Sequence, residues 1–507
     1  MLRKIRIALA AVFYVLITLL FLDFTGVLHQ WFGWLAKIQF LPALLALNVA
    51  AIIGLIVLTL IFGRVYCSVI CPLGVFQDVV AWIGHRGKRL PYTFSKPKNW
   101  LRWSVFAVFV VISLLGFVSF LDPYGVYGRF VHSVLQPAYM SVNNVLATWA
   151  ERTDSYAFYN VDVWLKSLPT LIVAVLCIVI VTVLAFRGGR TYCNSICPVG
   201  TFLGFLARFS WLKPVIDTSV CVNCGICARK CKASCIDAKE HKIDYSRCVG
   251  CMDCLYNCHS DAIAFCHPYK QPLPSLKKET AAPEVKAASA SETNNNRRSF
   301  LIGVALASTA VLNAQVKRKS AKLKMDGGLA EITPKQAPQR QTPITPAGSI
   351  SAKNMESHCV ACQLCVSACP NDVLRPSTKL NTFMHPEMSY ERGFCRPECT
   401  KCADVCPAGA IHRLTVEEKA STQIGHAVFV RERCVAITDG QPCGNCARRC
   451  PNGAILMVPS DPNDKKSIKI PAVDETRCIG CGACENLCPS RPLSAIYVEG
   501  LEVHHKI

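Results

Sequence analysis

The sequence predicts a multidomain membrane protein, in which a four-helix transmembrane part is joined to small α+β domains rich in cysteine. Three observations predict this fold class. Four long apolar runs lie in the first 190 of the 507 residues, and a motif that follows the second run recurs after the fourth. Most of the 31 cysteines fall into groups of four. A chain of this length, with 51% hydrophobic residues, has room for about three domains.

The four apolar runs each approach the roughly twenty residues that a membrane-spanning helix needs. They cover 7–24, 41–62, 101–120 and 168–186. Lys and Arg precede the first run, fill the segment between the second and third, and follow the fourth, whereas the other loops carry few. By the positive-inside rule, the N-terminus and the segment 63–100 are cytoplasmic. Because much of the net charge of +21 flanks these runs, it favours a membrane protein over one that binds nucleic acid.

An internal repeat organises the membrane part, which we place in residues 1–210. Residues 63–76 read GRVYCSVICPLGVF, and residues 189–202 read GRTYCNSICPVGTF. Two parallel span–span–CxxxCP copies are therefore predicted. They bring Cys67, Cys71, Cys193 and Cys197 to one depth near the cytoplasmic surface, where clustered thiols favour a redox or metal role. Disulfides and simple packing are the alternatives, and Cys177 in the fourth run is expected to be a small apolar core residue.

Residues 211–267 hold two groups of cysteines, both spaced C-x2-C-x2-C-x3-C. This spacing is typical of bacterial ferredoxins, whose thiolates hold cubane 4Fe–4S clusters and whose fourth Cys ligates the partner cluster. The predicted ligands are Cys221, Cys224, Cys227, Cys231, Cys248, Cys251, Cys254 and Cys258. By the same rule, Cys258 completes the first cluster and Cys231 the second. No apolar run intervenes, so this domain is predicted to be cytoplasmic; Cys235 and Cys266 stay unassigned.

A larger domain of the same type is predicted over 351–507, where each of four cysteine groups is followed by proline. The predicted ligands are Cys359, Cys362, Cys365, Cys369, Cys395, Cys399, Cys402, Cys406, Cys434, Cys443, Cys446, Cys450, Cys478, Cys481, Cys484 and Cys488. A disulfide framework does not need this spacing, and zinc sites use pairs of CxxC motifs. The chain is therefore expected to bind six 4Fe–4S clusters, two in the first domain and four in this one, with about twenty-four irons.

The two domains are joined by segments of a different composition. Residues 268–296 and 316–350 are rich in Pro, Ala, Ser and Lys without apolar periodicity, and are predicted linkers. Between them, residues 297–315 begin with Arg297 and Arg298 ahead of a short apolar run, like a twin-arginine export signal. A fifth membrane anchor is the alternative. Both interpretations place the four-cluster domain on the outer, periplasmic side.

Together these motifs resemble the NapH/NapG-type quinol dehydrogenases, the ferredoxin-type membrane and periplasmic subunits of periplasmic nitrate reductase systems. Residues 1–270 resemble the membrane subunit and residues 293–507 the periplasmic one, here fused in one chain. The resemblance implies a role in nitrate respiration, with the membrane quinol pool as electron donor. It implies a periplasmic or membrane-anchored cytochrome c or reductase as acceptor. The chain departs from the family in this fusion and in lacking proline after Cys231 and Cys258.

The resemblance also implies how the four outer motifs exchange their last cysteines. In related four-cluster subunits, the first motif pairs with the fourth and the second with the third. That pattern would join Cys488 to Cys359, Cys362 and Cys365, Cys369 to Cys478, Cys481 and Cys484, Cys450 to Cys395, Cys399 and Cys402, and Cys406 to Cys434, Cys443 and Cys446.

The expected function is that of a quinol-oxidising electron conduit in the bacterial inner membrane, with lipid but no nucleic acid as a partner. As the quinol dehydrogenase component of an electron-transfer chain, it needs no side-chain nucleophile. Asp23, His29, Asp122 and His132 are candidate proton acceptors for quinol at the outer ends of spans, although interfacial polar residues are the simpler interpretation. The alternative function is a redox relay, in which a cytoplasmic donor reduces the four CxxxCP thiols to activate a periplasmic metalloenzyme.

Overall fold

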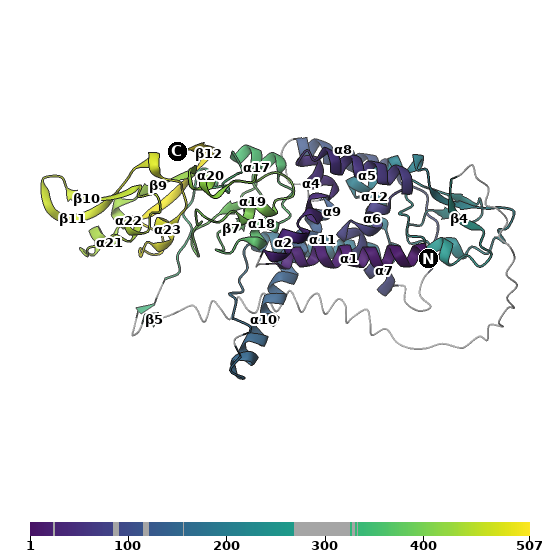
Figure 1. The fold of residues 1–507 in the computed structure, drawn as a ribbon, viewed down its shortest axis with the longest axis horizontal. Helices are drawn as coiled ribbons and strands as arrows, with labels where there is room; N and C mark the ends of the chain where they lie inside the picture. The colour runs from purple at the N-terminus through teal and green to yellow at the C-terminus, as the bar shows by residue number, and fades with distance from the viewer. Residues whose placement is uncertain are drawn as a thin grey trace.

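Three bodies follow one another along the longest axis of the computed structural model: the two-cluster domain, a helical part and the four-cluster domain (Figure 1). The structure describes residues 1–23, 26–84, 91–114, 121–155, 157–267, 325–326, 330–331 and 333–507. The predicted linker 268–296 and the predicted twin-arginine segment 297–315 lie outside the described residues. The helical part separates the two cysteine-rich domains, so that they occupy opposite ends of the molecule (Figure 1).

Two of the described helices, α1 (Leu2–Leu22) and α11 (Leu168–Gly188), are long and apolar enough to cross a membrane. They correspond to the first and fourth predicted runs. The third run forms α8 (Asn99–Leu114), which has 16 residues, and residues 115–120 lie outside the described part. The two full-length helices make the chain a candidate membrane protein.

The second predicted run is not one continuous helix, which corrects the prediction of a span over 41–62. It divides into α4 (Phe40–Leu45) and α5 (Val49–Phe62). Leu47 takes a left-handed conformation with φ of 50°, and the Asn48 side chain accepts a hydrogen bond from the Ala51 N–H. An asparagine at this position starts a new helix because its side chain satisfies a backbone donor that has no helical partner.

The predicted internal repeat is confirmed as a structural repeat. In each copy, a short helix carries the first cysteine, and a second helix begins at the proline after the second cysteine. Proline suits the first position of a helix because it has no N–H to leave unsatisfied. The four helices are α6 (Val65–Val69), α7 (Pro72–Gly84), α12 (Thr191–Ser195) and α13 (Pro198–Leu206).

The remaining helices of this part lie around the repeat. Before the second run come α2 (Val27–Phe32) and α3 (Trp34–Lys37). After the third run, α9 (Pro123–Phe130) and a π-helical turn (Val131–Leu135) lead into α10 (Gln136–Glu151). All of α9 is buried, whereas α10 extends away from the other helices (Figure 1).

The two-cluster domain has the α+β architecture predicted for a ferredoxin-type domain. Strand β1 (Lys213–Ile216) pairs antiparallel with β4 (Ile263–Cys266), so the two ends of the domain lie together. Between them lie a second antiparallel pair and two short helices that pack against each other. These are β2 (Ile236–Asp237), β3 (Lys242–Ile243), α14 (Ile226–Arg229) and α15 (Asp253–Tyr256).

The four-cluster domain repeats this design twice along the chain. Its first half contains a short hairpin and the packed helices α18 and α19. These elements are α17 (Ala352–His358), α18 (Leu364–Ala368), β7 (Leu374–Pro376), β8 (Pro386–Met388), α19 (Lys401–Val405) and α20 (Val416–Ala420). In its second half, β9 pairs with β12, β10 with β11, and α22 packs on α23. These are β9 (Thr422–Phe429), α21 (Val435–Thr438), α22 (Asn445–Arg448), β10 (Ile455–Asp461), β11 (Asp464–Val473), α23 (Ala483–Leu487) and β12 (Ile496–Lys506).

The described end of the second predicted linker, residues 333–350, belongs to the four-cluster domain, which corrects the prediction of a linker over 316–350. Ile344 is buried in the core of that domain, and the Arg340 guanidinium donates to both carboxylate oxygens of buried Glu485 at 2.6 and 2.8 Å. Burial of an apolar side chain and a buried ion pair offset the entropy of ordering a Pro-rich segment. Further back, β5 (Met325–Asp326) pairs with β6 (Ala330–Glu331).

Both cysteine-rich domains are fixed to the helical part by buried contacts. At one end, Arg102 donates to Ser246 Oγ at 3.1 Å, and Lys232 forms an ion pair with Asp78 at 3.3 Å. At the other end, His132 Nδ1 lies 2.8 Å from Ser367 Oγ. The two cysteine-rich domains therefore pack against the helical part to form one continuous structure.

Candidate metal centres

The thiols of the two-cluster domain line two separate cavities, and they divide as the sequence predicts. One cavity of about 410 Å³ is lined by Cys221, Cys224, Cys227 and Cys258. The other, of about 390 Å³, is lined by Cys231, Cys248, Cys251 and Cys254. Each cavity thus receives three thiols from one motif and the fourth from the other. A set of four thiols with apolar neighbours suits a cubane cluster, because thiolates are its ligands and the apolar shell limits access of water.

Two cysteines of this domain were left unassigned by the sequence. Cys235 is a fifth thiol beside the second cavity, with its Sγ 3.5 Å from that of Cys231. The hydrogen bond from Cys235 lowers the pKa of Cys231 to about 7, against the opposing effect of burial. Cys266 lies at the end of β4 opposite Lys213 and lines neither cavity. No signal in the spacing distinguishes Cys235 from an ordinary core residue.

In the four-cluster domain, the structure groups the thiols of neighbouring motifs, which corrects the pairing of first with fourth and second with third. Cys406 lies in electrostatic range of Cys359, Cys362 and Cys365, and Cys369 lies in range of Cys395 and Cys402. The cause is the packing of α18 against α19, which brings the first and second motifs together. Burial raises the pKa of Cys406, although the backbone N–H groups of residues 408–411 lower it.

The third and fourth motifs are grouped in the same way. Cys450 lies in electrostatic range of Cys478 and Cys481, and Cys488 in range of Cys446, because α22 packs on α23. Backbone N–H groups point at the exchanged thiols: Ala454 donates to Cys450 Sγ at 3.2 Å, and Ala495 to Cys488 Sγ at 3.3 Å. Such donors stabilise thiolate ligands and tune cluster potentials.

The two halves of this domain meet between the second and fourth motifs. The Cys395 N–H donates to the Cys481 carbonyl at 2.9 Å, and the two thiols lie in electrostatic range of each other. The first motif faces the helical part, because Cys362 joins the core that contains Tyr124 and Tyr127 of α9. The four groups of thiols thus run from the helical part outward.

A third set of thiols lies inside the helical part. Cys67, Cys71, Cys193 and Cys197 are all buried in one core and influence one another electrostatically. The structure thereby brings together the two CxxxCP pairs, as the repeat predicts. We call these four residues the thiol quartet. Among the residues that the structure describes, no three Cys, His, Asp or Glu side chains form a site for a single metal ion.

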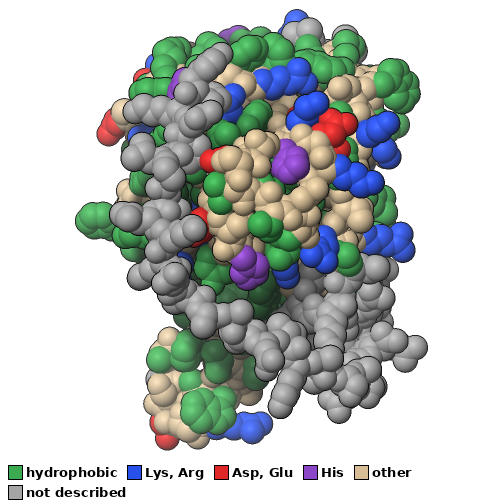
Figure 2. Space-filling view, turned by 90° about the vertical axis from the view of Figure 1, so that its right-hand side faces the viewer, with side chains coloured by type: hydrophobic (Ala, Val, Ile, Leu, Met, Phe, Trp, Pro, Cys, Tyr) green, Lys and Arg blue, Asp and Glu red, His purple; other side chains and the backbone are tan. Residues whose placement is uncertain are grey.

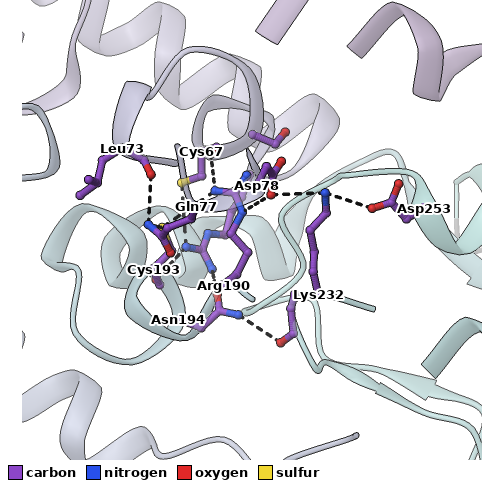
Figure 3. Close-up of polar contacts among 12 residues, drawn as sticks. Cys67, Leu73, Gln77, Asp78, Arg190, Cys193, Asn194, Lys232 and Asp253 are labelled. Atoms are coloured by element: carbon purple, nitrogen blue, oxygen red, sulfur yellow. Dashed lines mark hydrogen bonds and ion pairs between the residues drawn. The ribbon is translucent and has the colours of Figure 1, made fainter. Parts of the chain in front are cut away.

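Two buried arginines, which the sequence analysis did not single out as functional, connect the repeats around the thiol quartet. Arg64 of the first copy donates to the Cys193 carbonyl at 3.1 Å and the Asn194 amide oxygen at 2.9 Å. Arg190 of the second copy donates to the Cys67 carbonyl at 2.7 Å (Figure 3). Both arginines are fully buried. The signal was present as the Gly–Arg pair that opens each copy.

Only the first copy carries a carboxylate at this level. The Asp78 carboxylate accepts a hydrogen bond from Arg190 Nε at 2.8 Å and forms ion pairs with Lys232 at 3.3 Å (Figure 3) and with Arg6 at 2.9 Å. Burial raises the pKa of Asp78, but Arg190 and Lys232 outweigh burial and hold that pKa below its usual range. Gln77 also donates to Cys193 Sγ at 3.2 Å. Burial raises the pKa of Cys67, Cys71 and Cys197, and for Cys67 the nearby Arg64 and Arg190 oppose this effect.

The close approach of the repeats predicts the effect of one added methyl group. A Cβ on Gly74 would lie 2.1 Å from the Cys67 carbonyl oxygen and 2.8 Å from an Arg190 nitrogen. Gly74→Ala is expected to lower the free energy of unfolding by about 1–3 kcal/mol, since overpacking moves the backbone. Gly54→Ala is the control, because nothing lies within 4 Å of that position. Denaturant titrations that show equal stability for the two variants would contradict the packing described.

The four predicted proton acceptors for quinol are all engaged in structural contacts. Asp23 forms an ion pair with His29, with Oδ2 and Nδ1 3.2 Å apart. Asp122 caps α9 by accepting from the Gly125 N–H at 2.6 Å, and burial raises its pKa to about 6. His132 lies 2.7 Å from Gln136 Oε1, and burial lowers its pKa to about 3. Their role as quinol-site residues is not supported by these contacts.

Comparison with known proteins assigns this chemistry to a family. A model described as a 4Fe–4S binding domain matches residues 44–91 and 170–216, another 4Fe–4S binding domain matches 353–375, and a 4Fe–4S dicluster domain matches 441–491. The methylamine utilization ferredoxin-type protein MauM of Methylobacillus flagellatus is 34% identical over 169 residues, which are 32% of this chain and 70% of MauM. The ferredoxin-type protein NapG of Escherichia coli is 32% identical over 180 residues, 32% of this chain and 75% of NapG. The chain belongs to the Nap/Mau family of ferredoxin-type iron–sulfur proteins.

As a member of the Nap/Mau family, the chain is an iron–sulfur electron-transfer protein with several 4Fe–4S binding domains. The ferredoxin-type protein NapF of Escherichia coli is a further relative, 29% identical over 162 residues, which are 32% of this chain and 87% of NapF. No solved structure matches the chain. The dicluster model covers the last three cysteines of the third outer motif and all of the fourth, which agrees with the grouping of those two motifs in the structure.

Proposed function

We propose that this protein is a membrane-bound quinol dehydrogenase component that passes electrons through six 4Fe–4S clusters to a periplasmic acceptor. The observation that supports this proposal most strongly is the series of thiol groups along the long axis of the molecule. The two-cluster domain lies at one end of the molecule, the helical part in the middle and the four-cluster domain at the other end (Figure 1). The first contains the two thiol-lined cavities, the second the thiol quartet and the third the four outer thiol groups. A series of redox centres through an apolar body is the arrangement that moves single electrons across a membrane.

The proposed topology has four spans, with the two-cluster domain in the cytoplasm and the four-cluster domain in the periplasm. It rests on α1 and α11, on the shorter apolar helices α5 and α8, and on the position of the helical part between the two domains. The end face of the two-cluster domain is rimmed by Lys and Arg side chains (Figure 2). That charge agrees with a cytoplasmic location by the positive-inside rule. The twin-arginine segment would export the folded outer domain.

The side chains have three tasks in this function. The 24 cysteines of the six ferredoxin motifs would hold the clusters, which supply one-electron chemistry when bound. Backbone N–H groups beside Cys406, Cys450 and Cys488 would set the cluster potentials. Buried apolar side chains around each thiol set would keep water away. Either menaquinol or ubiquinol would be the donor, and a cytochrome c or a nitrate reductase system the acceptor.

The test is the reduction of the purified, cluster-loaded protein by quinol. Under anaerobic conditions, ubiquinol or menaquinol analogues are expected to bleach the cluster absorbance and to produce the EPR signals of reduced clusters in both domains. Dithionite serves as the control for total reducible clusters. Full reduction by dithionite together with no reduction by either quinol would reject the dehydrogenase function.

One observation favours a second candidate, the relay from a cytoplasmic donor. Cys224 is exposed, and it lines the first cavity of the two-cluster domain. A soluble reductant could therefore approach that cavity directly. The relay predicts rapid reduction by a reduced low-potential ferredoxin without quinol, and loss of electron transfer to the outer domain when the thiol quartet is replaced by serine. Reduction by quinol but not by the ferredoxin would reject the relay.

A further inference from the structure

A cleft of about 1350 Å³ lies where α1 and α7 meet the two-cluster domain. Its walls along the helices are apolar and come from Ile7, Ala11 and Val15 of α1 and Val79 and Trp82 of α7. These side chains are exposed in the chain itself; Trp82 is 60% and Val15 52% accessible. On the proposed topology, Ile7, Ala11 and Val15 of α1 face lipid. The cleft is therefore open to apolar molecules from the membrane.

One end of the same cleft is polar. It is lined by Arg3, Arg6, Asp78, Lys232 and Asp253. These residues form a chain of ion pairs, in which Lys232 bridges Asp78 and Asp253 at 3.3 and 3.0 Å (Figure 3). Arg6 Nε is buried and has no hydrogen-bond partner among the described residues. A buried donor without a partner costs free energy, so a ligand oxygen in the cleft would stabilise it.

The polar end lies beside two sets of thiols. Lys232 directly follows Cys231, and Asp253 lies between Cys251 and Cys254, so the second cavity of the two-cluster domain adjoins the cleft. On the other side, Asp78 binds Arg190, which donates to the Cys67 carbonyl beside the thiol quartet. A molecule bound at the polar end would be next to an electron acceptor.

We propose that this cleft binds quinol, with the ring at the Arg6 and Asp78 end and the isoprenoid tail between α1 and α7. The inference rests on the proposed function and adds the place where the donor binds. Oxidation of one quinol to quinone releases two electrons and two protons. The electrons reduce two iron–sulfur clusters by one each, beginning with the one held by Cys231, Cys248, Cys251 and Cys254. The protons leave to water at the cytoplasmic mouth of the cleft.

The geometry favours this site over the outer end of the helical part. A cavity there, lined by His132 and Lys166, has only about 550 Å³. His132 already contacts both Gln136 and Ser367, and Lys166 donates to the Val366 carbonyl at 2.8 Å and pairs with Asp372 at 3.4 Å. The outer cavity is therefore smaller than the cleft, and His132 and Lys166 already have partners. The cleft also has the mixed apolar and polar walls that small-molecule sites share.

Ala11→Trp tests the proposal, because it places an indole in the cleft without changing any charged residue. Ala8→Trp is the matched control: Ala8 is also exposed on α1, but it does not line the cleft. Full-length, cluster-loaded variants are compared by stopped-flow reduction with a decyl-ubiquinol or a short-chain menaquinol. Ala11→Trp is expected to slow reduction by about tenfold or more, the effect of a loss of about 1.4 kcal/mol in binding. Ala8→Trp and dithionite reduction of both variants are expected to match the unmodified protein.

The outcomes separate this inference from the function on which it rests. If quinol does not reduce the unmodified protein, the proposed function fails. If quinol reduces the unmodified protein and Ala11→Trp at the same rate, the function holds and the cleft is not the quinol site. Loss of co-purified phospholipid from Ala11→Trp, with quinol reduction unchanged, would also overturn the proposal by identifying the cleft as a lipid site.

Discussion

An Arg190→Met substitution is expected to lower the free energy of unfolding by about 3–5 kcal/mol, the range for breaking one side of a buried ion pair. Arg190 is fully buried, and its guanidinium joins the Asp78 carboxylate to the Cys67 carbonyl. Methionine fills a similar volume but leaves both oxygen acceptors without this donor. Asp78 keeps Arg6 and Lys232, so the carboxylate stays ionised, whereas the two repeats lose the Arg190 contact and keep only those of Arg64. Unfolding in mixed micelles, followed by circular dichroism, measures the change.

Two further variants isolate the ion pair. Arg187→Met removes an exposed arginine from the end of α11, three residues before Arg190, and is expected to change stability by no more than about 0.5 kcal/mol. The double variant Arg190→Met with Asp78→Asn is expected to be less stable than Arg190→Met alone, because Arg6 and Lys232 then lose their shared carboxylate as well. Equal stability of Arg190→Met and Arg187→Met would show that the buried pair does not hold the repeats together.

The cysteine groups could be predicted because their information is local. Three thiols at intervals of three residues define a tight turn wherever they occur, and the thiols of the two-cluster domain divide between two cavities as that rule predicts. The exchange of fourth cysteines among four motifs is not local. It depends on which short helices pack together, and nothing in the spacing states that α18 packs on α19 rather than on α23.

The linker predicted from composition was also wrong for residues 333–350. Proline and lysine suggest a free segment, but Ile344 and the ion pair of Arg340 with Glu485 fix it to the outer domain. Glu485 lies inside the fourth motif, and its partner comes from 145 residues earlier in the chain. A buried carboxylate needs such a partner. Sequence periodicity cannot identify that partner when it is so remote.

The candidate site also contains residues that the sequence predicts and residues that it does not. The thiol quartet was predicted because the repeat is evident in the amino-acid sequence. Asp78 was missed because the second copy has glycine at the equivalent position. The structure explains the difference: a Cβ on Gly204 would clash with the backbone carbonyl oxygen of Ser246, which belongs to the two-cluster domain. The two halves therefore fasten the same domain with different groups. A residue that differs between two repeats can indicate function, but this can be recognised only when the packing around that residue is known.

Cys406→Ala provides the sharpest test of the outer clusters, because rival pairings predict opposite results for two double variants. In the structure, Cys406 shares its site with Cys359, so each single variant is expected to lose one cluster, about four irons. The double variant Cys359→Ala with Cys406→Ala is expected to lose no more than either alone. Cys406→Ala with Cys443→Ala removes ligands of two clusters and is expected to lose about eight irons. Iron and acid-labile sulfide per chain, with EPR, measure the loss.

Pairing of the second motif with the third would reverse the two double variants, since Cys406 would then share a cluster with Cys443. Cys177→Ala is the control for handling losses, because Cys177 lies within α11 and joins none of the ferredoxin motifs. The consequence extends to electron transfer. With neighbours paired, the cluster that Cys359, Cys362, Cys365 and Cys406 would hold faces the helical part, and on the proposed function its loss alone would separate the helical part from the three proposed clusters beyond it.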